Sequence, residues 1–164
     1  DAPQTTDGPG PNMVIEVADA SGATKGTIVL DLLPEKAPKH VERLVTLAKQ
    51  GAYDGVVFHR VIDGFMAQVG CPHGTGTGGS GKKLKAEFNR EPHVRGTVSM
   101  ARAEAEDSAN SQFFINFKDN DFLNGQYTVY GRVVSGMEFV DKITRGEPPA
   151  NPDRMISVKV AADA

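Results

Sequence analysis

The 164-residue sequence contains no tryptophan and a single cysteine, Cys71. One cysteine cannot form a disulfide within the chain, which fits a reducing compartment without excluding an oxidising one. No apolar run approaches the roughly 20 residues of a membrane-spanning helix, so we expect no membrane partner. Positive charge is not in excess either, since the formal net charge is −3. We therefore expect no nucleic-acid partner.

Familiar catalytic motifs are also missing. None of the four histidines has the spacing of a zinc motif such as HExxH, so no metal is expected. A GxSxG nucleophile elbow is absent. The glycine-rich stretch 69–81 is followed by Lys82 and Lys83, so it lacks the Ser or Thr of a phosphate-binding loop. Cys71 and His73 leave a thiol hydrolase as an alternative, although a glycine-rich loop would give them little fixed geometry.

The chain is long enough for one domain with a substantial core, and 39% of its residues are hydrophobic. Residues 1–12 are polar and rich in proline and glycine, which predicts a flexible segment ahead of a domain spanning 13–164. The sequence starts at Asp1 without a methionine. We expect export to a bacterial periplasm, with a cytoplasmic location as the alternative, and the start of the full-length gene checks this.

Short alternating segments dominate the remainder. They predict a mainly β fold, with strands at 13–17, 26–32, 57–62, 66–68, 97–101, 112–116, 127–134 and 156–160, and the stretch 53–62 leads into a central hairpin. Apolar residues at helical spacing predict helices over 34–50, ending at Gly51, and over 136–145. Many short strands with two helices favour a closed or nearly closed antiparallel barrel.

The stretch 58–68 reads as two strands joined by a turn at Asp63-Gly64, because glycine tolerates positive φ. Alternation places Phe58, Arg60 and Ile62 on one face. We expect His59 to point away from that face and to bond to the backbone. An arginine among apolar side chains is either tied to a carboxylate or kept for a ligand, because it cannot lose its charge.

Apolar and amide residues are predicted to gather around Arg60. They are Phe65, Met66, Gln68, Gln112, Phe114, Phe122, Leu123 and Tyr127. This set contains no general base and no nucleophile, so it suits a reaction with neither proton transfer nor a covalent intermediate.

Several motifs in order carry a family resemblance. FHRVIDGFMAQ at 58–68 is followed by GTGG at 76–79, SMARA at 99–103, SQFFIN at 111–116, FLNG at 122–125 and VYGRVVSGMEFVDKI at 129–143. From about Met13 to its end, the sequence closely resembles the cyclophilins, which are peptidyl-prolyl cis-trans isomerases, and the bacterial members above all. The resemblance implies an eight-stranded antiparallel closed barrel capped by two α-helices. It also implies a monomer that acts without metal or cofactor.

The resemblance also implies residue roles. Arg60 would donate a hydrogen bond to the prolyl nitrogen as it becomes pyramidal. Phe65, Met66, Phe114 and Leu123 would hold the proline ring, with Phe122 and Tyr127 as further substrate-binding walls. Gln68 would hydrogen-bond the substrate backbone and help hold Arg60, and the backbone of Arg102 would pair with the extended substrate. The neighbouring pocket, for the residue before X–Pro, would be shaped by Gly76, Ala101, Ala103 and Gln112.

Four positions depart from the family pattern: Tyr127 replaces a common His, Phe122 the Trp of many eukaryotic members, Arg102 an Asn, and Val69 a Gly. Weak binding of cyclosporin A is therefore expected. The partners implied are proline-containing unfolded or flexible protein segments, whose folding the enzyme would assist in the manner of a chaperone. A non-catalytic module that uses the same groove to bind proline-containing segments stays open as an alternative.

Overall fold

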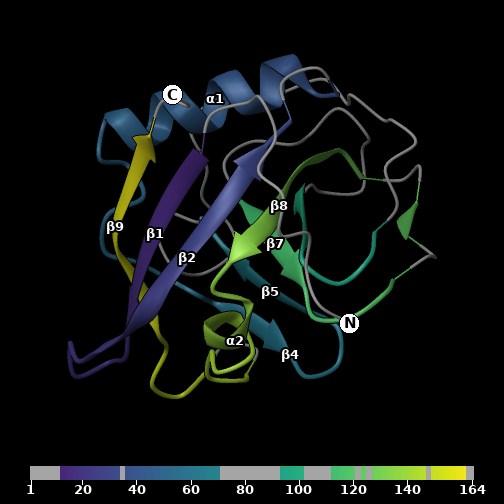
Figure 1. The fold of residues 1–164 in the computed structure, drawn as a ribbon. Coiled ribbons are helices and arrows are strands. Elements are labelled where there is room, and N and C mark those ends of the chain that lie inside the picture. Colours follow the sequence, from purple (N-terminus) through teal and green to yellow (C-terminus); the bar gives the residue numbers. More distant parts are fainter. Residues whose placement is uncertain are drawn as a thin grey trace.

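The computed structural model describes residues 12–33, 36–70, 93–101, 112–120, 123–124, 127–146 and 149–161. These ranges hold nine β-strands and two α-helices (Figure 1). The strands are β1 (Asn12–Ala18), β2 (Thr24–Leu32), β3 (Val56–Val57), β4 (Arg60–Ile62), β5 (Met66–Val69), β6 (Thr97–Met100), β7 (Phe113–Asn116), β8 (Val129–Ser135) and β9 (Arg154–Ala161). The helices are α1 (Pro38–Lys49) and α2 (Met137–Val140). Residues 1–11 of the predicted flexible segment lie outside the described residues, and Asn12 already belongs to β1.

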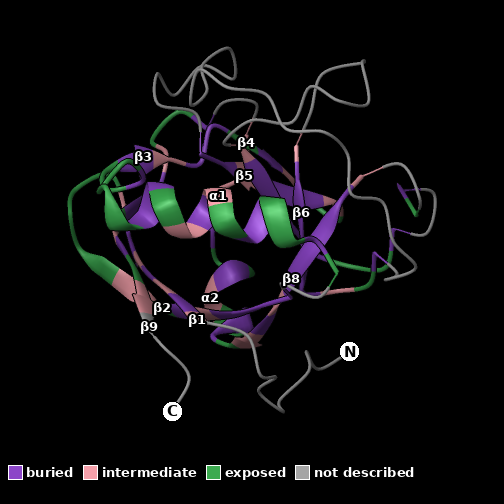
Figure 2. Ribbon diagram, turned by 90° about the horizontal axis from the view of Figure 1, so that it is seen from above, coloured by how far each residue is buried: buried purple, intermediate pink, exposed green. Residues whose placement is uncertain are grey.

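The strands form one antiparallel sheet in the order β3-β9-β1-β2-β8-β6-β7-β5-β4. Its two edge strands, β3 and β4, are consecutive in the chain, so the sheet has to curl until its edges come near each other. Figure 2 shows this curl, with strands arranged around the core and α1, in which buried and exposed residues alternate, lying across one end. The mainly β, two-helix fold is confirmed.

The expected closed, eight-stranded barrel is wrong in two details, because the described sheet is open and has nine strands. The strand expected over 57–62 is interrupted at Phe58 and His59. There the Phe58 N–H donates to the Asp153 carbonyl at 2.8 Å, and the Val61 N–H donates to the Gly146 carbonyl at 2.8 Å. These bonds tie the break to the segment between α2 and β9, and no strand pairing joins β3 to β4 in the described sheet.

The strands expected over 13–17 and 26–32 are confirmed as β1 and β2, which pair antiparallel with Ile15 opposite Ile28. Helix α1 begins at Pro38 instead of residue 34, and proline suits a first helical turn because its missing N–H would have no partner there. The helix is amphipathic as predicted, and Gly51 follows its end with a φ of 73°. Neither helix in the described ranges is long and apolar enough to cross a membrane.

Helix α2 is shorter than the stretch 136–145 that the apolar spacing predicts. After Val140 the chain continues in tighter turns, with the Ile143 N–H donating to the Val140 carbonyl. The Thr144 N–H then donates to the buried carboxylate of Asp153 at 2.8 Å. This bond to a residue nine positions further along the chain is not part of a helix, and the apolar periodicity of 136–145 contains no information about it.

Alternation along β5 and β7 separates two apolar clusters. Ala67 and Val69 of β5, with Phe113 and Ile115 of β7, join the main core inside the curled sheet. Met66 and Phe114, which point the opposite way, form a smaller cluster with Leu123 on the outer face. The sheet therefore presents an apolar surface outside its core.

Candidate active site

The β4–β5 hairpin places its side chains through a tight turn and a fixed register. The Phe65 N–H donates to the Ile62 carbonyl at 3.0 Å, and Gly64 has a φ of 70°, so the predicted turn is confirmed. Arg60 lies opposite Gln68, and Ile62 lies opposite Met66. Because both pairs share a face, an arginine and an amide stand beside apolar groups.

Two bonds from beyond the hairpin hold its turn. The Phe65 carbonyl accepts from the Phe117 N–H at 2.9 Å and from Nδ2 of Asn120 at 3.1 Å.

The expectation that Phe58 shares the face of Arg60 is wrong, because Phe58 belongs to the main core. It lies outside β4, where the strand alternation no longer applies.

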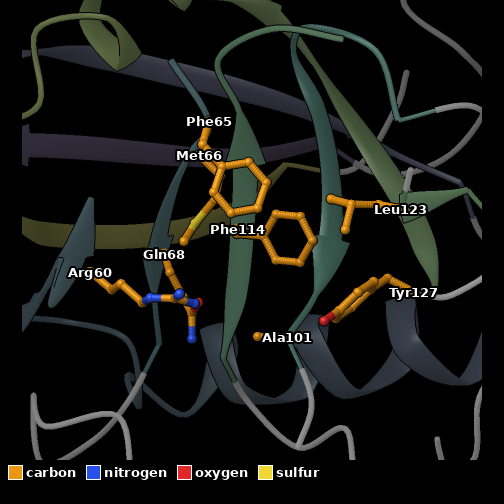
Figure 3. A pocket seen from close by; sticks show the side chains of 8 residues that line it. All are labelled: Arg60, Phe65, Met66, Gln68, Ala101, Phe114, Leu123 and Tyr127. Carbon is orange, nitrogen blue, oxygen red and sulfur yellow. The ribbon is translucent and has the colours of Figure 1, made fainter. Parts of the chain in front are cut away.

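A pocket enclosing about 400 Å³ of empty space, part of it open to solvent, lies on this outer face (Figure 3). Its lining residues are Arg60, Phe65, Met66, Gln68, Ala101, Phe114, Leu123 and Tyr127. They come from β4, β5 and the turn between them, from β7, and from the segments after β6 and β7, so residues far apart in the sequence meet here. All eight are residues that the sequence predicts for the site.

The floor of the pocket is apolar and closely packed. Met66, Phe114 and Leu123 are 2%, 4% and 7% exposed, and Phe65, Ala101 and Tyr127 pack around them. The Phe114 and Tyr127 rings meet edge to face with centroids 5.5 Å apart, an arrangement that aromatic pairs favour. This floor suits a small apolar ring.

The polar rim of the pocket lies on the hairpin. Arg60 is exposed, and Figure 3 shows its guanidinium extending to the same side as the Gln68 amide. Gln68 Nε2 donates to Gln112 Oε1 at 2.8 Å, which fixes the Gln68 side chain. Gln112 is thereby brought to the site although it does not line the pocket. The arrangement provides a charged donor and an oriented amide beside an apolar floor.

Comparison with known proteins agrees with this geometry. Residues 14–160 match the family described as cyclophilin type peptidyl-prolyl cis-trans isomerase/CLD. The chain is 52% identical over 155 residues to a probable peptidyl-prolyl cis-trans isomerase of Brucella suis, covering 84% of this chain and 79% of the relative. The chain belongs to the cyclophilin-type peptidyl-prolyl cis-trans isomerase family.

Other cyclophilins extend the comparison. Peptidyl-prolyl cis-trans isomerase B of Bacillus subtilis is 48% identical over 122 residues, or 73% of this chain and 85% of that protein. The crystal structure of a Hirschia baltica cyclophilin has a TM-score of 0.84 at 27% identity, covering 99% of this chain and 78% of that one. A Cryptosporidium parvum cyclophilin, determined in the presence of the dipeptide Ala-Pro, has a TM-score of 0.83 at 26% identity. That match covers 93% of this chain and 99% of the other.

Some predicted residues of this cyclophilin are not placed. Gly76, Arg102, Ala103 and Phe122 lie outside the described residues, as do Cys71 and His73 of the hydrolase alternative. Within the described part, no group of three or more histidine, cysteine, aspartate or glutamate side chains could hold a metal ion.

His59 does not make the expected backbone hydrogen bond to any residue that the structure describes. It is buried, and neither ring nitrogen has a hydrogen-bond partner among the described residues, so the expected backbone bond is wrong. Burial lowers the pKa of His59, and the charge of the neighbouring Arg60 lowers it further. The ring is therefore held neutral beside the polar rim.

Three residues behind the pocket were missed as site residues: His93, Asn120 and Asn124. Asn120 binds the turn that carries Phe65, and Asn124 binds His93, which packs against two pocket rings. The sequence gives only a weak signal for these three residues. A histidine and two asparagines in connecting segments gain their role only from contacts across the fold.

Acidification is expected to destabilise this cyclophilin well above the range in which carboxylates titrate. Burial lowers the pKa of both His59 and His93 below their ordinary value of 6.5. The unfolded chain then binds more protons than the folded chain just below pH 6.5, so the free energy of unfolding falls as pH falls. Urea unfolding at about pH 7.5 and about pH 5 checks this. A His93→Phe variant should show a smaller loss, and an equal loss would contradict the assignment.

Proposed function

We propose that this cyclophilin accelerates rotation about X–Pro bonds, with the proline ring on the apolar floor and Arg60 beside the prolyl nitrogen. The observation that carries the proposal is the composition of the pocket. One guanidinium and one oriented amide border a floor of Met66, Phe114 and Leu123, and none of the described lining residues is a His, Asp, Glu, Lys, Ser, Thr or Cys. Such a site suits a rotation in which no covalent bond is made or broken.

The chemistry needs little more than a well-placed donor. Amide resonance sets a barrier of roughly 18–20 kcal/mol, and rotation removes conjugation between the prolyl nitrogen and the carbonyl. As the nitrogen becomes pyramidal, its lone pair becomes available as an acceptor. A donor from Arg60 then stabilises the twisted state more than the planar one, which is the condition for catalysis. Arginine suits this role because it stays charged and its donors lie in one plane.

The pocket favours a proline ring over a longer side chain. Phe114 and Leu123 close the floor, and the Phe114–Tyr127 contact forms one wall. The related Cryptosporidium parvum cyclophilin was determined with a proline-containing dipeptide, which supports a ligand of this class. Partners would be unfolded or flexible protein segments that contain proline, because a folded chain rarely offers this bond to a concave site.

Gln68 is proposed to orient the substrate main chain. Its Nε2 is engaged by Gln112 at 2.8 Å, which leaves its carbonyl oxygen oriented as an acceptor for a substrate N–H. The residue before X–Pro would then lie toward Ala101 and Gln112. Gly76, Arg102 and Ala103 complete this subsite in the proposal by family resemblance alone.

A protease-coupled assay with X–Pro test peptides, varied at X, tests the function. If the protein is an isomerase, cis-to-trans conversion of the peptide is faster in its presence, whereas a binding module would bind the peptide without changing this rate.

Alkylation of Cys71 tests the hydrolase alternative. Full isomerase activity after alkylation would dismiss a Cys71–His73 nucleophile.

Cyclosporin A is expected to inhibit this cyclophilin more weakly than it inhibits eukaryotic members. In those members a tryptophan at the position of Phe122 donates its indole N–H to the drug, and phenylalanine has no such donor. An unpaired acceptor costs roughly 1–3 kcal/mol, or about one to two powers of ten in affinity. Tyr127, in place of the usual histidine, also changes the adjoining wall of the pocket.

The measurement is a drug titration of isomerase activity on the wild type and on Phe122→Trp. The variant should be inhibited at lower drug concentration, while turnover of short X–Pro peptides stays close to that of the wild type. Tight inhibition of the wild type, or no gain in the variant, would show that the missing donor does not control affinity.

A further inference from the structure

His93 lies directly behind the apolar floor. It is fully buried, and its ring is stacked on Phe114 with centroids 6.4 Å apart and planes 17° apart. The same ring meets Tyr127 edge to face at 6.5 Å and 77°. Phe114 and Tyr127 both line the pocket and also contact each other. Three rings therefore form one mutually packed group, of which two members face the ligand and one does not.

The hydrogen bonds of His93 determine which ring nitrogen carries its proton. Its backbone N–H donates to Asn124 Oδ1 at 2.7 Å, which identifies that atom as an acceptor. The His93 Nδ1 atom lies 3.1 Å from the same oxygen. Because an amide oxygen only accepts, Nδ1 has to be the protonated nitrogen. Nε2 then bears the lone pair, and it is buried without a partner among the described residues.

His93 is also hydrogen-bonded to the segment that carries Leu123, another residue of the pocket floor. The His93 carbonyl accepts from the Asn120 N–H at 2.7 Å, and the Asn120 carbonyl accepts from the Leu123 N–H at 3.0 Å. Asn124, which receives the two His93 donors, follows Leu123 in the chain. His93 is thus bonded to the segment that carries Leu123 and packed on the rings of Phe114 and Tyr127.

We infer that His93 is a positioning residue of the substrate pocket, which holds Phe114, Tyr127 and Leu123 in place as a neutral, Nδ1-protonated imidazole. The inference rests on the proposed function, since it concerns the pocket for the proline ring. A second proton on Nε2 would be a buried charge without a partner among the described residues. Burial accordingly lowers the pKa of His93, and its contact with Asn124 offsets part of that change.

Two substitutions separate the packing of the His93 ring from its hydrogen bond to Asn124. His93→Phe keeps a ring against Phe114 but removes the Nδ1 donor, whereas His93→Asn keeps a donor near Asn124 and removes the ring. The apolar floor binds planar and twisted substrate alike, so disturbing it should raise KM more than it lowers kcat. We expect KM to rise at least about threefold in each variant, with kcat changed less than about twofold.

Two further variants keep the test independent of folding defects. Asn124→Leu alters an exposed position, removes the acceptor and should raise KM in the same way. His40→Phe is the matched control, because His40 is also fully buried and stacked on a tyrosine, Tyr130, yet neither residue lines the pocket. His40→Phe should change the melting temperature and leave KM unaltered.

The tautomer provides a readout that needs no variant. The ring ¹⁵N chemical shifts of His93 in the wild-type protein at neutral pH should show a proton on Nδ1 and a bare Nε2. A proton on Nε2 alone, or unchanged KM in folded His93→Phe and Asn124→Leu, would overturn the inference. An inactive wild type would instead refute the proposed function, so the two failures are distinguishable.

Discussion

Replacing Arg60 by alanine should lower kcat/KM at least about tenfold, because a donor aimed at transition-state charge contributes on the order of 2.7–4 kcal/mol at comparable sites. Arg60 is exposed and lies on an edge strand of the described sheet, so the fold should survive. The effect should fall mainly on kcat, since the planar substrate has no pyramidal nitrogen to accept the bond. Protease-coupled kinetics with one X–Pro peptide measures it.

Two control variants separate the effect of the Arg60 guanidinium on activity from the effect of positive charge in general. Arg60→Lys keeps the charge but not the planar donor array, so it should retain only part of the activity. Arg43→Ala removes an arginine on α1 that does not line the pocket, and its activity should equal that of the wild type. A folded Arg60→Ala protein with the wild-type rate would remove Arg60 from the mechanism.

Replacing Gly136 by alanine should cause a large loss of stability from a single methyl group. Gly136 has a φ of 88° at the start of α2, a conformation that costs other residues about 1–3 kcal/mol. An added Cβ would also overlap the Thr27 carbonyl oxygen and lie 3.0 Å from Ile28 Cα on β2. Both are backbone atoms of a central strand and cannot move aside cheaply. We expect a loss of at least about 3 kcal/mol in the free energy of unfolding.

Gly55→Ala is the matched control for backbone strain without overlap. Gly55 has a similar φ of 79°, but a Cβ added there would meet no atom within 4 Å. Its loss should be about 1–2 kcal/mol. Urea unfolding of the two variants compares them, and equal losses would mean that the contact between α2 and β2 yields more readily than the structure implies.

Local patterns determined much of the site. The Asp63-Gly64 turn and the alternation along 60–68 and 112–116 placed Met66, Gln68 and Phe114 on one face before any tertiary contact was considered. Strand alternation and positive φ are properties of a few consecutive residues, so sequence alone predicts them well. The family motifs then supplied the roles proposed for these residues.

Contacts between distant segments decided the rest. The Phe58 N–H bonds to the Asp153 carbonyl at the point where the strand expected there is interrupted, and Val61 pairs with Gly146 just beyond the break. His93 is a plain connecting residue in the sequence, and only the fold brings its ring against Phe114. Such contacts depend on how the whole sheet curls, because they join residues whose separation along the chain carries no periodic signal.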